Sequence, residues 1–323
     1  MLNPKNYDPA IMYGAKITAD QIAGMIGLPY VGKILYIDPT NGNDTSNAGE
    51  SQNDALKTLT TSEGKMTNYA HDVAIIVPGG TSGTSEVAGI TWDKHYAHVI
   101  GNTAPVAVSQ RSRIVFTTDA TDPCLTISGN GNIFKNVQVA TYQDSNDVLV
   151  SLTGNRNYFG GVHFAGIGSA TAGDDTSARC LSLSGAEENL FEGCTVGLDS
   201  VARSDANANL ELASGSARNI FRSTRFIAFA DNAGALFVKA ASSADIDRFV
   251  EFEDCMFING IASSGTTMTV GMSIHAAVGG LVMLTGTTNM VGATDLADDF
   301  TAVYVSAVGD TTAATAALMV NAA

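Results

Sequence analysis

The sequence is poor in charge, and poorest in positive charge. Only 15% of its 323 residues are Asp, Glu, Lys or Arg, and 17 basic residues stand against 32 acidic ones, which gives a formal net charge of −15. Phosphate binding requires a Lys/Arg surface, and no basic cluster occurs, so we expect no nucleic acid partner. No apolar run is long enough to span a bilayer, so we expect no membrane partner either.

The sequence also lacks the features of secreted and metal-binding proteins. Residues 1–5 show neither the basic nor the apolar region of a signal peptide. The four cysteines form no CxxC pair and no Cys/His metal spacing, and the five histidines show no ligand spacing. We therefore expect folding in a cytoplasm, with neither a metal nor a cofactor.

The main positive feature of the sequence is a pattern that occurs five times. It reads Asn, apolar, Phe, polar, small or polar, small apolar or Thr, polar, apolar, and the last copy lacks the leading Asn. The central Phe recurs about every 25 to 32 residues, a period that belongs to solenoids and arrays. A short apolar strand precedes each copy. The copies are Asn132–Val139, Asn157–Phe164, Asn189–Val196, Asn219–Phe226 and Val250–Phe257.

This unit predicts an all-β solenoid. It has no leucine-rich pattern and no 3.6-residue periodicity, and it is shorter than the roughly 40 residues of a propeller blade. Three short strands per unit instead fit one coil of a parallel β-helix, in which equivalent strands of successive coils pair about 4.8 Å apart. Equivalent side chains then stack along the axis. We expect an interior ladder of Phe134, Phe159, Phe191, Phe221 and Phe252.

The same alignment assigns positions to the cysteines. Cys194 and Cys255 share one repeat position, and Cys124 and Cys180 share another, each pair being two coils apart. Their Cα atoms would lie about 9.6 Å apart, beyond the limit of about 7 Å for a disulfide. We expect buried thiols that act as small hydrophobic side chains.

The two ends of the chain depart from the repeat. Residues 1–33 read as an extended arm and a short helix, which Thr18 and Gln21 begin as a capping box and Gly27 ends. So short a helix must dock, either as a cap on the open end of the solenoid or on a partner protein. Residues 34–80 lead into the coils, residues 81–307 form them, and residues 308–323 form a tail rich in Ala and Thr. The candidate partner-binding residues are Tyr7, Tyr13, Ile22, Met25 and Ile26.

Residues 34–80 resemble a known family. A strand, the turn Asn41-Gly42-Asn43-Asp44, the segment Lys57-Thr58-Leu59 and an apolar strand from Val73 to Val77 that ends in Pro-Gly follow one another. This order is similar to the N-terminal segment of the pectate-lyase-like β-helix superfamily. The resemblance implies a right-handed parallel β-helix with a first coil at Val73–Val77.

The sequence offers no clear catalytic site. Members of this superfamily include lyases, glycosidases and phage tailspikes, and glycoside hydrolysis requires two carboxyl groups about 5 to 9.5 Å apart. Glu192 and Glu253 occupy the same repeat position two coils apart and could flank a groove, but we expect them to be solvated outward positions of the strands. No HExxH, GxSxG or P-loop motif occurs. We therefore predict no catalytic residues and no enzymatic activity.

Together these features resemble a tailed-phage virion protein assembled in the host cytoplasm. We predict a head decoration or cement protein on the capsid surface that binds the major capsid protein, with the arm and helix as its contact. The resemblance implies a homotrimer, consistent with the closed symmetry of most homo-oligomers. The alternative is a tailspike or fibre that binds or cleaves host polysaccharide.

Overall fold

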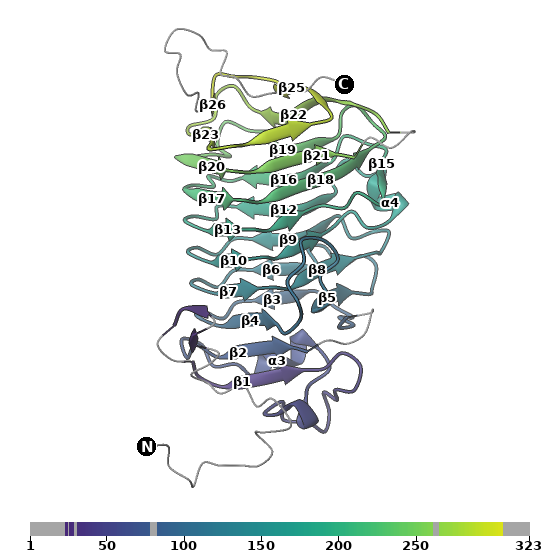
Figure 1. The fold of residues 1–323 in the computed structure, drawn as a ribbon, viewed down its shortest axis with the longest axis vertical. Coiled ribbons are helices and arrows are strands. Elements are labelled where there is room, and N and C mark those ends of the chain that lie inside the picture. Colours follow the sequence, from purple (N-terminus) through teal and green to yellow (C-terminus); the bar gives the residue numbers. More distant parts are fainter. Residues whose placement is uncertain (1–22, 25, 29–30, 78–82, 261–264, 306–323) are drawn as a thin grey trace.

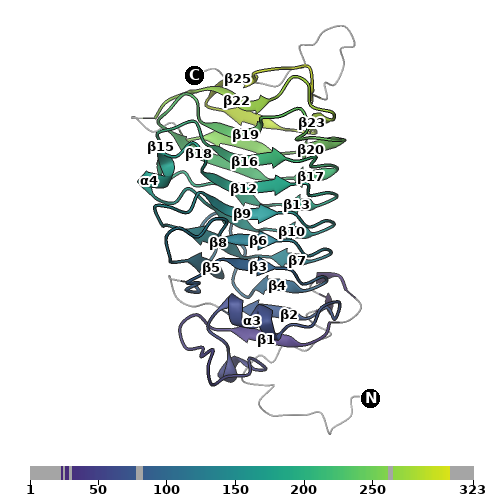
Figure 2. The same ribbon diagram turned by 180° about the vertical axis from the view of Figure 1, so that it is seen from behind.

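The chain winds repeatedly through three parallel sheets, as seen from two sides in Figures 1 and 2. The computed structural model describes residues 23–24, 26–28, 31–77, 83–260 and 265–305. Each coil between residues 98 and 297 contributes one strand to sheet A, one to sheet B and one to sheet C, and neighbouring strands in every sheet come from successive coils. All the strand pairs are parallel, as in the pairing of Phe134 with Phe159 and of Phe159 with Phe191. The structure is therefore a parallel β-helix.

Short strands build the three sheets. Sheet A contains β1 (Ile34–Ile37), β2 (Val73–Ile76), β4 (His98–Gly101), β7 (Ile133–Lys135), β10 (Tyr158–Gly160), β13 (Leu190–Glu192), β17 (Asn219–Arg222), β20 (Phe249–Glu253), β23 (Leu281–Thr285) and β26 (Val303–Val305). Sheet B contains β5 (Arg113–Phe116), β8 (Gln138–Thr141), β11 (His163–Ala165), β14 (Thr195–Val196), β18 (Arg225–Ala230), β21 (Met256–Asn259) and β24 (Asn289–Val291), with β15 (Ala202–Arg203) beside β18. Sheet C contains β3 (Ile90–Trp92), β6 (Leu125–Ile127), β9 (Val148–Leu152), β12 (Arg179–Ser184), β16 (Ala208–Ala213), β19 (Leu236–Ala240), β22 (Met268–Ile274) and β25 (Ala293–Ala297).

The predicted phenylalanine ladder is confirmed. The five rings are at most 1% exposed and lie one above another on the inner side of sheet A. Phe191 stacks on Phe159 with ring centroids 4.7 Å apart and on Phe221 at 4.4 Å. Phe134 and Phe252 extend the column at 5.4 and 5.1 Å. The repeat pattern therefore reports the strand register, because a shift by one residue would turn every ring to the outside.

The leading Asn of each copy forms a second, polar ladder that the sequence did not predict. The carboxamide oxygen of Asn157 accepts the backbone N–H of Asn132 at 2.8 Å, and that of Asn189 accepts the N–H of Asn157 at 2.8 Å. Asn219 continues the series with the N–H of Asn189 at 3.1 Å. These side chains are at most 2% exposed, so they satisfy buried backbone donors at the turn before sheet A.

The fifth position of the pattern lies at the turn between sheets A and B. Its residues all have a positive φ of 49° to 61°, in the left-handed region. Glycine, asparagine and aspartate tolerate this region best, which explains why only small or short polar residues occur there. The residues are Asn136, Gly161, Gly193, Ser223 and Asp254. This turn divides each copy of the pattern between the two sheets.

The four cysteines are free and buried, as predicted. Burial raises the pKa of the Cys194 and Cys255 thiols to about 12. These two thiols also donate hydrogen bonds, at 3.2 Å, to the carbonyl oxygens of Phe159 and Phe221 in the preceding coils. The Thr224 hydroxyl donates the equivalent hydrogen bond, 3.2 Å long, to the carbonyl oxygen of Phe191. Cys and Thr can therefore replace one another at this position of the repeat.

The N-terminal end of sheet A starts at β1, which pairs in parallel with β2 and so precedes the first coil that the resemblance placed at Val73–Val77. After β1, the carboxylate of Asp44 accepts the backbone N–H of Lys57 at 2.7 Å and the Thr58 hydroxyl at 2.8 Å. The single turn η2 (Gln52–Asp54) lies between them, and Thr58 caps α3 (Leu59–Lys65). Leu59 and Met66 join the main hydrophobic core beside the first strands of sheet A. A further short helix, α4 (Ala170–Gly173), lies in the loop between β11 and β12.

The described part of the N-terminal helix lies on the outside of sheet A. Residues 23, 24 and 26 are helical, and Gly27 ends the helix with a φ of 76°. Ile26 is half-buried and packs on the outward-facing side chains of the first three strands, which include Tyr36 and Ile75. It therefore covers the side of the solenoid and not its open end. Tyr7, Tyr13, Ile22 and Met25 lie outside the described residues.

Candidate functional site

A half-buried apolar strip runs along the outer face of sheet A, parallel to the solenoid axis. Since side chains alternate along a strand, the residues next to each ladder Phe point outward. The residue before each of the first four ladder Phe forms the strip, because the register aligns these positions from coil to coil. Its members are Ile133, Tyr158, Leu190 and Ile220.

A charged row lies beside this strip. The residue after each ladder Phe points outward as well, so Glu192, Arg222 and Glu253 stand on three adjacent strands. Arg222 Nε lies 2.5 Å from Glu253 Oε2, and Arg222 Nη1 lies 3.8 Å from Glu192 Oε1. These bonds and the charge of Glu253 raise the pKa of the Arg222 guanidinium. The register places the two glutamates at equivalent positions two coils apart, as the repeat indicated, and Arg222 stands between them.

Tyr158 joins the strip to the charged row. Its hydroxyl donates a hydrogen bond of 2.7 Å to Glu192 Oε2. Burial, together with the neighbouring glutamate, raises the pKa of the phenol, which therefore stays a donor at neutral pH. Glu251 provides a third carboxyl group, two residues before Glu253 on β20, and accepts a hydrogen bond of 2.8 Å from the Thr285 hydroxyl.

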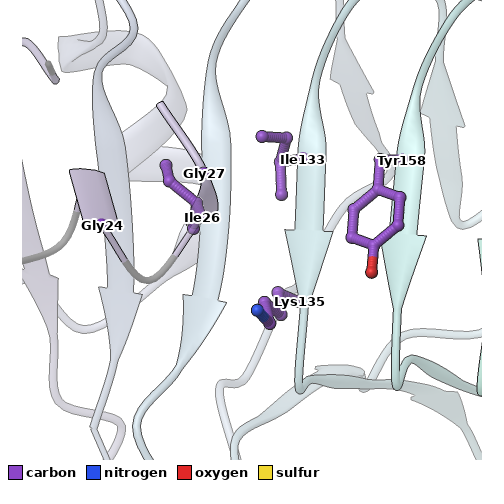
Figure 3. A pocket seen from close by; sticks show the side chains of 6 residues that line it. All are labelled: Gly24, Ile26, Gly27, Ile133, Lys135 and Tyr158. Carbon is purple, nitrogen blue, oxygen red and sulfur yellow. The ribbon is translucent and has the colours of Figure 1, made fainter. Parts of the chain in front are cut away.

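A pocket of about 400 Å³ opens at the N-terminal end of the strip, where the helix lies against the sheet (Figure 3). Ile26 faces Ile133 across it, and the ring of Tyr158 and the side chain of Lys135 frame its other side. The pocket thus combines apolar walls with a phenol and an ammonium group, a composition typical of small-ligand sites. The lining residues are Gly24, Ile26, Gly27, Ile133, Lys135 and Tyr158.

Several other polar residues lie away from this face. Glu187 and Glu188 occupy a turn, where Glu188 pairs with Arg156 at 2.7 Å and with Arg218 at 3.1 Å. His98, at the start of β4, is fully buried: its imidazole lies 3.1 Å from that of His71 and accepts the backbone N–H of Ile133 at 3.0 Å.

The residues that the structure describes contain neither a cluster of metal ligands nor a membrane-spanning helix. No three His, Cys, Asp or Glu side chains among them come together as a metal site would require. In the same residues no helix has the length and apolar character of a membrane span.

The fold, but not the sequence, matches known proteins. No protein-family model matches the chain, and no curated protein matches it. Among solved structures, a pectate lyase matches over 81% of this chain and 64% of its own, with a TM-score of 0.54 and 17% identity. A pectin methylesterase in complex with a hexasaccharide matches over 82% of this chain and 80% of its own, with a TM-score of 0.52 and 13% identity. The chain therefore spans less than two thirds of the length of the lyase.

These matches confirm the right-handed parallel β-helix, which the resemblance implied. They also correct one expectation. Both structures are of enzymes, and this contradicts the prediction that the chain is not an enzyme. Identities of 17% and 13% establish the fold alone, so the reaction must be argued from the residues of this chain.

Proposed function

We propose that the outer face of sheet A binds a neutral polysaccharide and that its glutamates hydrolyse it. The observation that carries this proposal is the apolar strip next to a row of charged hydrogen-bonding groups, both running along the solenoid axis. A sugar ring has apolar C–H faces and a rim of hydroxyl groups. A polymer lying along the axis would place its faces on the strip, including Tyr158 and Leu190, and its hydroxyls on the charged row.

The charge of the face favours a neutral glycan over a uronate polymer. Lys135 and Arg222 oppose Glu192, Glu251 and Glu253 on this face, and the whole chain carries a formal charge of −15. A polyanion would be repelled by the excess of carboxylates both during its approach and when bound. On this point the chain would differ from enzymes that act on pectate.

The carboxyl groups have positions that suit hydrolysis. Glu251 and Glu253 point outward from one strand with Cα atoms about 6.6 Å apart. Their side chains can therefore place the two carboxyl groups at the roughly 6.5 to 9.5 Å separation that an inverting mechanism needs. The two carboxyl groups have different partners, because Glu253 binds the Arg222 guanidinium and Glu251 accepts a hydrogen bond from the Thr285 hydroxyl. We assign Glu253 as the base and Glu251 as the acid. Glu251 would protonate the glycosidic oxygen as its bond to the anomeric carbon breaks. Glu253 would take a proton from the water that adds to that carbon.

The experiment incubates the protein with a panel of neutral and uronate polysaccharides and measures both retention on the immobilised polymer and release of reducing ends. We expect a neutral polymer to be bound and cleaved. Glu253→Gln should abolish cleavage but keep binding, and Tyr158→Ala should weaken binding. Asp295→Asn, at an exposed carboxylate of sheet C, is the matched control and should change neither. Absence of binding to every neutral polymer, or equal behaviour of all variants, would refute the proposal.

This proposal develops the sequence-based alternative of a polysaccharide-binding protein. The matched structures are of enzymes named for pectate and pectin, and they favour that alternative over a capsid decoration protein. The capsid-surface location, the contact of Ile26 with a capsid and the homotrimer stay predictions. Light scattering of the purified protein tests the trimer directly.

A further inference from the structure

Four ring-bearing side chains gather in the turns that precede β2 and β4. The rings of Tyr69 and His95 are stacked with centroids 5.0 Å apart and planes 7° from parallel. Tyr96 lies 6.0 Å from Tyr69 and 5.3 Å from His71. Tyr69 is 63% exposed and Tyr96 is 41% exposed, so these rings present open surface to solvent. We call this group, Tyr69, His71, His95 and Tyr96, the aromatic platform.

Hydrogen bonds hold the platform rigid. The backbone N–H of Tyr69 donates to the carbonyl of His95 at 3.0 Å and so joins the two turns that carry the stacked rings. The imidazole of His95 accepts the N–H of Asn130 at its Nδ1 at 3.1 Å. Exposed aromatic rings fixed in this way lose little conformational entropy when a ligand packs on them.

The platform is continuous with the face of sheet A. Tyr96 and Gly131 occupy equivalent positions in successive coils. A Cβ at Gly131 would come 2.6 Å from the Tyr96 ring. This glycine therefore makes room for the ring. Two residues later on β7 comes Ile133, which lines the pocket beside Tyr158. Two coil spacings, roughly 9.6 Å, separate the turn that carries Tyr96 from the turn before Tyr158.

We infer that the aromatic platform binds a further sugar unit of the same glycan that lies on sheet A, an inference that rests on the proposed function. The electron-rich face of an aromatic ring attracts the C–H groups of a sugar face, and an exposed Tyr69 offers such a face. A protein partner fits less well. A stable protein interface buries about 800 Å² on each side, whereas the platform consists of four side chains.

The experiment measures dissociation constants by calorimetry for a ladder of oligosaccharides of increasing length, cut from the polymer that the protein retains. Tyr69→Ala should weaken binding of the long oligosaccharides by about threefold to tenfold, the equivalent of one aromatic contact. Short oligosaccharides, which reach only Tyr158, should bind as before. Tyr69→Phe keeps the ring and should bind every length like the unaltered protein.

The outcomes separate this inference from the proposed function. If Tyr158→Ala weakens all lengths and Tyr69→Ala weakens none, the sheet face binds glycan and the platform inference is wrong. If no oligosaccharide binds to the unaltered protein, the proposed function itself fails. Loss of a self-association or of a protein contact in Tyr69→Ala, with glycan binding intact at all lengths, would also overturn the inference. A thermal melt shows that each variant is folded.

Discussion

Replacement of Phe191 by alanine tests the stacked interior of the solenoid. Phe191 is fully buried and packs between the rings of Phe159 and Phe221, at 4.7 and 4.4 Å. A buried Phe→Ala change costs about 3 to 5 kcal/mol. Because Phe191 loses a stacked partner on both faces, we expect the upper end of that range, about 4 to 5 kcal/mol.

Urea unfolding followed by circular dichroism measures this cost. Phe191→Leu, which keeps most of the volume, should cost only about 1.5 kcal/mol. Phe300→Ala is the exposed control, since Phe300 is 54% exposed. It should change the free energy of unfolding by no more than about 0.5 kcal/mol. If Phe191→Ala destabilises the protein no more than Phe300→Ala, the phenylalanine column does not hold the coils together.

Three further predictions follow from buried groups. Asn189→Ala should cost about 2 to 4 kcal/mol in the same urea assay, because it leaves the buried N–H of Asn157 without its 2.8 Å partner and removes two bonds of the Asn189 amide. Burial, with His71 as a second cause, lowers the pKa of His98 to about 3, and burial also lowers the pKa of His163. The unfolded chain thus takes up protons below about pH 6.5 that the folded protein does not, so stability should fall as pH drops from there, for His98 by up to about 1.4 kcal/mol per pH unit toward pH 3. His98→Gln should flatten that profile, and an unchanged slope would contradict the assignment. The four cysteines should resist a thiol reagent in the folded protein and react together on unfolding, because burial raises the pKa of each to about 11 or 12.

The sequence predicted the coil and its register, because a repeat shows which residues occupy equivalent positions. Phe159 and Phe191 could be aligned without knowing anything else, and the stacking of their rings follows from that alignment. The repeat also identified the position shared by Glu192 and Glu253. One sequence was therefore enough to predict which residues of successive coils lie one above another.

Contacts that depend on the direction of a side chain, or on how two turns meet, were not predictable from the repeat. The leading Asn served as a marker of the repeat, but its role in bonding the next coil depends on a side-chain direction. His98 is buried where its imidazole meets that of His71 and the backbone N–H of Ile133, two contacts with neighbouring coils that no spacing predicts. Tyr69 and His95 stack because two loops of different length meet. No spacing in the sequence carries that information.

A crystal structure of the protein with a bound neutral oligosaccharide tests the central claim most directly. The account predicts sugar rings along the outer face of sheet A, resting on Tyr158 and Leu190 and within hydrogen-bond distance of Glu192. Sugar bound elsewhere on the solenoid, or an empty face at saturating oligosaccharide, would contradict it.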